Sequence, residues 1–405
     1  MPTKTDIFPK IAIGAALVMV AAGCGGADEA ASGGAPGVDT AKKTVNVGGW
    51  TIASGAFAGQ AAAGRGAETC IASANDAGGV NGWKFNIKLN DTAGVPTRAL
   101  QETKNQVEGG QMFSIVWGPG TSSNQSVMPY IQGKSMPYQP GMSGDSLLGK
   151  DIKNVFPMIP AYSRLGYHLA DYAMGELKGK RIALMYENSG IGQDVQKTLA
   201  AYVKSKGGEL VVEVPTAPDD SDFTPMAIAL KNAKPDVVIN HAGPTALVKV
   251  KAALMASGVN VPWVSGYYVA SDAVVKLDPA AMDGVYFQSY LVPFFSDDPA
   301  AVKFRDDMKK FAPDTNADIQ SINGYASCQI FVEAFKAMTD NNGEVSQENL
   351  IKAFEAIGTK RIGVNGEITY TPEEHLGNNA AFMVQWKKDG GWNVVQDARP
   401  LPTAP

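Results

Sequence analysis

The feature that most constrains the fold is a regular alternation of short apolar runs with helix-length amphipathic segments, which begins at Thr44. The apolar runs predict strands and the longer segments predict helices. Apolar strands that each precede a helix are typical of parallel sheets covered on both faces. The predicted strands are Thr44–Gly49, Lys84–Asn90, Met112–Trp117, Arg181–Tyr186, Leu210–Val214 and Asp236–Asn240. The predicted helices are 61–77, 96–108, 123–133, 162–176, 192–206, 223–232 and 245–257.

The chain has 405 residues, which is too long for one such sheet, and it shows no long linker within this pattern. The sequence therefore predicts an α/β protein with two lobes joined by short crossings. The C-terminal part differs, because Gly366–Tyr370 and Ala381–Trp386 resemble strands and 387–391 resembles a hairpin turn before Trp392–Val395.

The first residues resemble a targeting signal. Lys4 and Lys10 precede an uncharged apolar run at 11–22, which is too short to span a bilayer but suits a signal peptide. The run ends at Ala-Ala-Gly-Cys24, which is similar to a bacterial lipobox, whose cysteine is acylated. We therefore predict a lipoprotein signal peptide at 1–23 and lipidation at Cys24, with an ordinary signal peptide cut nearby as the alternative.

Residues 24–42 are almost all small or polar, so they predict a flexible tether between an anchored cysteine and the folded body. Two further thiols remain, Cys70 and Cys328. In an oxidising compartment such a pair forms a disulfide or stays as two separately buried cysteines, and the sequence leaves both possibilities open.

Composition argues against several classes of function. With 35 basic and 40 acidic residues the net charge is −5, which disfavours a nucleic-acid binder. Only three histidines and three cysteines occur, widely spaced, so no metal site or cofactor is predicted. The phosphate-loop spacing at 144–150 fails because Asp151 replaces the required hydroxyl. No nucleophile–histidine–acid pattern supports an enzyme.

The informative residues lie in loops that follow the predicted strands. Glycines and hydroxyl residues gather at 48–59, 118–124 and 139–143, and the second of these opens a helix whose N–H groups suit an anion such as a carboxylate. Thr121 is also a plausible helix cap. His241 stands just beyond the strand Asp236–Asn240, where α/β sheets present ligand-binding loops, although a structural role fits it as well.

These residues resemble the type I periplasmic binding proteins of the branched-chain amino-acid transport family. The likeness runs from Val45 to about Val395 and includes the alanine-rich segment 64–74, the turn 75–82, the Gly-Pro-Gly-Thr-Ser-Ser loop at 118–123 and Asp222-Phe223-Thr224. It implies two Rossmann-like lobes joined by a three-segment hinge, in the manner of a Venus flytrap. The implied N-terminal lobe consists of residues 43–160 and 291–379. The implied C-terminal lobe consists of residues 161–290 and 380–405.

The resemblance also implies site residues. Thr121 matches a hydroxyl that binds the ligand carboxylate, and Gly141 and Ser143 match positions that bind the carboxylate and amine. Ile191 stands where a tyrosine is common, and Tyr267 stands where amino-acid binders have the glutamate that pairs with the ammonium. Because a buried ammonium needs a counter-charge, the ligand is predicted to be an organic acid, aromatic acid or amide rather than leucine. The aromatic residues that could wall such a ligand are Trp50, Phe57, Tyr162, Tyr267 and Tyr268.

The implied function is solute capture for an ATP-driven importer. The implied partners are an ABC permease and its ATPase. The implied location is the outer face of a bacterial cell membrane or the periplasm, and the protein is expected to be a monomer. The same fold also suits a ligand-sensing receptor that reports to a kinase or chemoreceptor. An enzyme using His241 and a purely structural surface lipoprotein are further alternatives.

Overall fold

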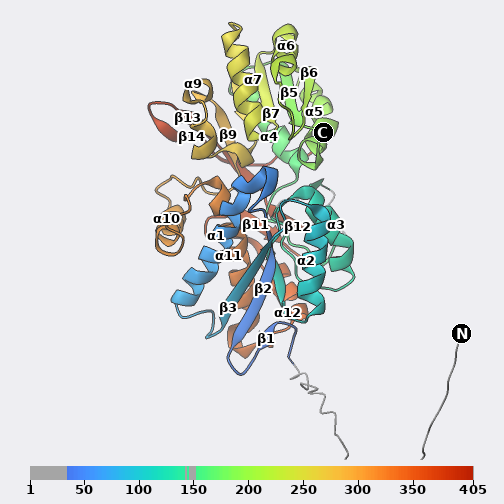
Figure 1. Ribbon diagram of the computed structural model, residues 1–405, viewed down its shortest axis with the longest axis vertical. Helices are drawn as coiled ribbons and strands as arrows, with labels where there is room; N and C mark the ends of the chain where they lie inside the picture. The colour runs from blue at the N-terminus through green and yellow to red at the C-terminus, as the bar shows by residue number, and fades with distance from the viewer. Residues whose placement is uncertain (1–33, 142–143, 146–151, 405) are drawn as a thin grey trace, which may run out of the picture. The chain divides into compact units, whose positions relative to one another are not determined.

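The structure, a computed structural model, describes residues 34–141, 144–145 and 152–404. The predicted signal peptide, Cys24, the first part of the predicted tether and Ser143 lie outside the described residues. In the part described, the strands form two α/β lobes and a small accessory sheet (Figure 1).

The first lobe is built around β2 (Thr44–Thr51), which pairs in parallel with β3 (Lys84–Asp91) and β4 (Ser114–Trp117). Parallel bridges at Tyr138 and Val155 continue the sheet beyond β4. Helices cover it on both sides, as two-faced burial requires. They are α1 (Ala61–Asp76), α2 (Pro96–Glu108), α3 (Thr121–Gln132), α10 (Pro299–Phe311), α11 (Ile319–Thr339) and α12 (Gln347–Glu355), with the short η1 (Gly55–Gln60) and η4 (Asp340–Asn342).

The second lobe holds a seven-stranded sheet in the order β14-β13-β9-β8-β7-β5-β6. Its strands are β5 (Arg181–Glu187), β6 (Glu209–Thr216), β7 (Val237–His241), β8 (Trp263–Ser265), β9 (Tyr286–Ser289), β13 (Ala380–Lys387) and β14 (Gly391–Pro400). Strands β5 to β9 are parallel, while β13 and β14 are antiparallel additions at one edge. The helices are α4 (Tyr162–Gly175), α5 (Gly190–Ser205), α6 (Thr224–Ala233), α7 (Pro244–Ala256), α8 (Asp272–Val275) and α9 (Pro279–Met282), with η3 (Tyr267–Val269).

The chain passes between the lobes three times. It leaves the first sheet after Val155 to reach α4, returns after β9, and crosses again between β12 and β13. The accessory sheet near these crossings consists of β10 (Gly358–Arg361), β11 (Glu367–Tyr370) and β12 (His375–Asn378). Asn378 ties two crossings together, because its backbone N–H and its side-chain amide both donate to the carbonyl of Met158.

The predicted α/β fold with two lobes is confirmed, and every predicted strand and helix has a counterpart that differs by at most a few residues at its ends. The largest useful difference concerns α3. It begins at Thr121, directly after Gly120, whose φ of +92° suits glycine, so Thr121 lies in the first helical turn. The exact residue boundaries of the lobes stay a prediction.

The C-terminal part of the predicted tether differs from the prediction. Residues 34–42 lie on the first lobe, where β1 (Val38–Asp39) pairs antiparallel with the start of β2. Gly37 has a φ of +72°, and its N–H donates to the carbonyl of Gly110 at 3.0 Å. Backbone hydrogen bonds of this kind need no apolar side chain, so a small, polar composition does not exclude them.

The helices α1 and α11 cross at two glycines. A Cβ on Gly324 would lie 1.7 Å from the carbonyl oxygen of Ala63, and one on Gly66 would lie 1.8 Å from that of Ser321. Only glycine permits this approach of two backbones. A disulfide between Cys70 and Cys328 joins the same pair of helices.

We expect Gly324→Ala to lower the free energy of unfolding by about 3 kcal/mol, because overpacking a close contact forces the two helix backbones apart. Gly175→Ala is the matched control, since no atom lies within 4 Å of a Cβ there. Urea denaturation of both variants measures the difference. Equal stability of the two variants would contradict this picture of the helix crossing.

Candidate functional site

The parallel strands of the second lobe end at one edge of the sheet, and chemically active side chains gather there. β5 ends at Glu187 and β7 at His241, and Tyr267 and Tyr268 follow β8 in η3. The pairing of Tyr186 with His241 and of Asn240 with Ser265 brings these strand ends level. Loops beyond the carboxyl ends of parallel strands are where α/β sheets bind ligands.

Five residues predicted for the site come together between the lobes, and we call them the interlobe cluster: Thr121, Tyr162, Ile191, His241 and Tyr267. The Thr121 hydroxyl lies 3.4 Å from the Tyr162 hydroxyl, and its methyl group faces Gly190 beside Ile191. The ring of Tyr162 lies 6.0 Å from that of His241. Thr121 belongs to the first lobe and the other four to the second, so the cluster joins the two lobes.

Burial keeps the cluster electrically neutral near pH 7. It raises the pKa of Tyr162 to about 12, against hydrogen bonds from Thr121 and Tyr267 that lower it. It lowers the pKa of His241 to about 4, although the nearby Ile191 backbone raises it. Burial also holds the pKa of Tyr267 well above its usual range. Among the described residues, no group at hydrogen-bond geometry satisfies either ring nitrogen of His241. These atoms are free to bind a ligand.

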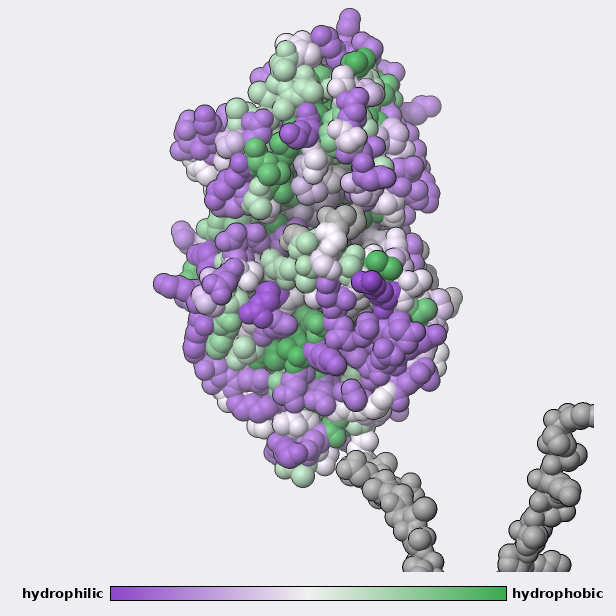
Figure 2. Space-filling model, viewed as in Figure 1, coloured by the Kyte–Doolittle hydropathy of each residue, from purple (hydrophilic) through white to green (hydrophobic). Residues whose placement is uncertain are grey.

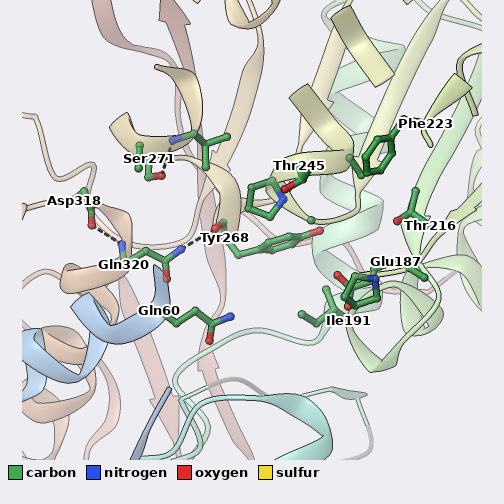
Figure 3. Close-up of a pocket in the computed structure, with 17 residues that line it drawn as sticks. Gln60, Glu187, Ile191, Thr216, Phe223, Thr245, Tyr268, Ser271, Asp318 and Gln320 are labelled. Atoms are coloured by element: carbon green, nitrogen blue, oxygen red, sulfur yellow. Dashed lines mark hydrogen bonds between the residues drawn. The ribbon is translucent and has the colours of Figure 1, made fainter. Parts of the chain in front are cut away.

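Next to the cluster lies a cavity of about 260 Å³ between the two lobes (Figure 3). Tyr268 and Ile191 connect the two, because both line the cavity and the ring of Tyr268 lies 5.3 Å from that of His241. The second lobe supplies most of the wall and the first lobe the rest. The side chains labelled in Figure 3 are Gln60, Glu187, Ile191, Thr216, Phe223, Thr245, Tyr268, Ser271, Asp318 and Gln320.

Hydrogen bonds between the lobes close the cleft on both sides of the cluster. The amide of Gln320, on α11, donates to the carbonyl of Tyr268 at 2.8 Å. On the other side, the backbone N–H of Asp145 donates to the Asp194 carboxylate at 2.9 Å, and that of Ser163 donates to the Asp145 carboxylate at 3.3 Å. The structure therefore shows the lobes in contact beside a partly open cavity that suits a small solute.

Of the residues predicted to contact the ligand as walls or as site residues, only Ile191 and Tyr268 line the cavity in the described part of the chain. Trp50 is fully buried in the first lobe, where its indole N–H donates to the carbonyl of Pro119 at 2.8 Å and its ring covers Gly118. A Cβ on Gly141 would lie 2.7 Å from the Trp117 ring, so this glycine fits a packing contact. These residues support the loop that leads into Thr121. Phe57 lies in η1, and its side chain is not among those described.

Several cavity residues were not predicted from the sequence. Glu187 ends a parallel strand, as His241 does, so the same rule could have identified it. Gln60 and Gln320 lie on segments of the first lobe that meet only in the folded chain, and no sequence pattern marks them.

The face shown in Figure 2 is mostly hydrophilic, with hydrophobic residues in small separate groups. The large hydrophobic side chains that are exposed among the described residues are scattered: Val95, Ile228, Leu277, Val302, Val394 and Val395. Such single residues are normal on a protein surface, so the cavity is the strongest candidate site. Within the described ranges, no group of histidine, cysteine and acidic side chains could hold a metal ion, and no helix is long and apolar enough to cross a membrane.

The family model for periplasmic binding proteins matches residues 44–391. The chain belongs to this family, in its type I, two-lobed form. The relatives that match its sequence are Leu/Ile/Val-binding proteins and their homologues. Leu/Ile/Val-binding protein homolog 1 of Brucella abortus is 23% identical over 341 residues, which cover 82% of this chain and 88% of that protein.

Solved structures show the same fold. A fatty acid ABC transporter substrate-binding protein from Thermomonospora curvata superposes with a TM-score of 0.79 at 20% identity, over 92% of this chain and 97% of that one. A branched-chain amino acid ABC transporter protein from Thermus thermophilus with bound valine gives a TM-score of 0.78 at 19% identity, over 91% and 97%. These named relatives are binding proteins rather than enzymes.

Proposed function

We propose that this protein captures a small organic solute between its lobes and delivers it to an ABC permease. The cavity and the interlobe cluster beside it support this function best, because in the described part of the chain the buried ring nitrogens of His241 lack hydrogen-bond partners. The named relatives bind branched-chain amino acids or belong to fatty-acid transport, which supports a small organic solute as the ligand.

In this proposal the ligand carboxylate, or a similar acceptor group, binds at Thr121 and the start of α3, where helix N–H groups and a partial positive charge favour it. Tyr162, Ile191, His241 and Tyr267 contact the ligand from the second lobe. Ligand binding favours the closed form to the extent that the ligand binds that form more tightly than the open one. The permease would recognise the closed form.

The proposed location is the outer face of a bacterial cell membrane, with the acylated Cys24 as the anchor. The family is a family of periplasmic binding proteins, which supports a position outside the cytoplasm. The lobe formed by β2, β3 and β4 would follow this anchor directly, since the folded body begins near residue 34.

The experiment that tests the function is titration calorimetry of ligand-free protein against organic acids, aromatic acids, amides and branched-chain amino acids. Small-angle scattering of the same samples should show closure with every solute that binds. A protein whose scattering and melting temperature respond to none of these solutes would refute the proposal.

Thr121→Ala is expected to weaken binding of such a solute by about 1.5–3 kcal/mol, roughly 10- to 150-fold, because the variant leaves a charged acceptor group without its hydroxyl donor. Ser122→Ala is the matched control, since Ser122 is exposed on the same helical turn. Calorimetry of both variants measures the change. Unaltered affinity in Thr121→Ala would place the acceptor site elsewhere.

A further inference from the structure

The cavity wall is rich in hydrogen-bond acceptors that have no donor. Glu187 is only 6% exposed and lines the cavity. One of its carboxylate oxygens, Oε1, accepts a hydrogen bond from the Ser189 hydroxyl at 2.6 Å. Among the described residues no donor and no cation contacts the other oxygen, Oε2. Burial and the Glu187 carboxylate both raise the pKa of Tyr268, which places that charge beside the ring that lines the cavity.

A second carboxylate faces the cavity from the first lobe. Asp318 caps α11, and its Oδ1 accepts from the backbone N–H groups of Gln320 and Ser321 at 2.9 and 3.3 Å. Its Oδ2 has no partner among the described residues. Burial raises the pKa of this carboxyl group, against hydrogen bonds from Ser321 and Gln320 that lower it. The buried carbonyl oxygen of Gln60, Oε1, also lacks a donor in the described part of the chain.

Three of the donors in the wall are already used. The hydroxyl of Tyr268 donates to the carbonyl of Ala242 at 3.3 Å, that of Thr216 donates to the carbonyl of Tyr186 at 3.2 Å, and the Gln320 amide donates to Tyr268. The described lining contains two carboxylates and no lysine, arginine or histidine. Two largely buried carboxylates in a wall that has no cation favour an occupant that carries a positive charge.

We propose that the cavity binds the ammonium group of a ligand whose carboxylate lies at Thr121. This inference rests on the proposed function and specifies its substrate class, an ω-amino carboxylic acid. Glu187 compensates the ammonium charge, Asp318 adds negative charge on the opposite wall of the cavity, and Gln60 accepts a further N–H bond. The acid that is absent at Tyr267 would thus be replaced by Glu187 in the cavity, which fits a ligand with its charges farther apart than in an α-amino acid.

The test compares probes that differ only at the far end. Ligand-free protein is titrated with 4-aminobutanoate, 5-aminopentanoate and 6-aminohexanoate, and with pentanoate, hexanoate and heptanoate, in which a methyl group replaces the ammonium. Leucine and valine are titrated in parallel. We expect at least one amino acid of the first series to bind about tenfold or more tightly than its methyl counterpart, a difference of 1.4 kcal/mol or more.

Glu187→Gln should lower the preference for the amino acid over its methyl counterpart about tenfold. Glu213→Gln, which removes an exposed carboxylate on β6, should leave this preference unchanged. Methyl-ended acids that bind as tightly as the amino acids would overturn the inference and leave solute capture intact, as would binding of leucine or valine alone. A preference that survives in Glu187→Gln would also overturn it. Binding of none of these probes or of the other solute classes would refute the proposed function together with this inference.

Discussion

Between pH 7 and pH 4 the free energy of unfolding is expected to fall by about 6 kcal/mol through two buried histidines, at about 1.36 kcal/mol per pH unit and histidine. Burial lowers the pKa of His241 to about 4, and it lowers that of His168 to about 4 as well. The Nδ1 of His168 lies 2.8 Å from the amide nitrogen of Gln288, which also donates to the carbonyl of Leu165. Because Nδ1 accepts a hydrogen bond from this amide, it carries no proton, which favours the neutral form of the imidazole.

The direction follows from the protons that each state binds. In the unfolded chain both histidines bind a proton as the pH falls through 6.5, whereas in the folded protein they stay neutral until about pH 4. Between these values the unfolded state holds more protons, so stability is lost as the pH falls. Above pH 6.5 the two histidines contribute no pH dependence.

Guanidinium denaturation from pH 7.5 to 4 measures this slope in the native sequence and in His168→Gln and His241→Gln. Each substitution should remove the contribution of one histidine to the slope of the unfolding free energy against pH, even if it also lowers stability at neutral pH. Asp39→Asn is the control, because hydrogen bonds from Lys42 hold the pKa of that carboxyl below its usual range, so its linkage lies at lower pH. Parallel stability curves for the native protein and both histidine variants would contradict the prediction.

The fold could be predicted from the sequence because the apolar periodicity is long and regular. Runs such as Arg181–Tyr186 are strongly apolar, and each predicted strand is followed by an amphipathic segment, so the α/β pattern has few alternatives. The exception is 34–42, where backbone hydrogen bonds around Gly37 hold a segment of unremarkable composition on the sheet. Such pairing depends on φ at one glycine and on a distant partner, neither of which composition reveals.

The candidate site could be predicted only in part. The rule that loops after parallel strands bind ligands led to His241, and the family resemblance led to Thr121 and Tyr267, which the structure brings into one cluster with Tyr162 and Ile191. Aromatic character alone is a poor guide, as Trp50 illustrates, because a large ring fills a core as readily as a binding site.

The cavity wall shows a different limit. Whether Glu187 is a surface carboxylate or a buried acceptor depends on what packs against it. Gln60 in η1 and Gln320 in α11 line the same cavity only because the fold brings these segments to the second lobe. A single sequence gives the identities of such residues but does not show that they line one cavity in the folded chain. The substrate class inferred for the cavity therefore could not be reached before the structure.

Loss of the disulfide between Cys70 and Cys328 is expected to lower the free energy of unfolding by about 4–5 kcal/mol. The bond spans 258 residues, and cross-linking so long a segment restricts the unfolded chain strongly. The Cys70→Ala, Cys328→Ala double variant tests this, with alanine chosen because a serine hydroxyl would be buried without a partner.

Reductant supplies the control for that variant. Dithiothreitol should lower the denaturation midpoint of the native protein towards that of the double variant and leave the variant itself unchanged, since only the native protein has this bond to lose. Because the bond joins α1 to α11 within the first lobe, the folded double variant should retain its ligand affinity. A native protein that is indifferent to reductant throughout the unfolding transition would show that the two thiols contribute to stability by packing alone.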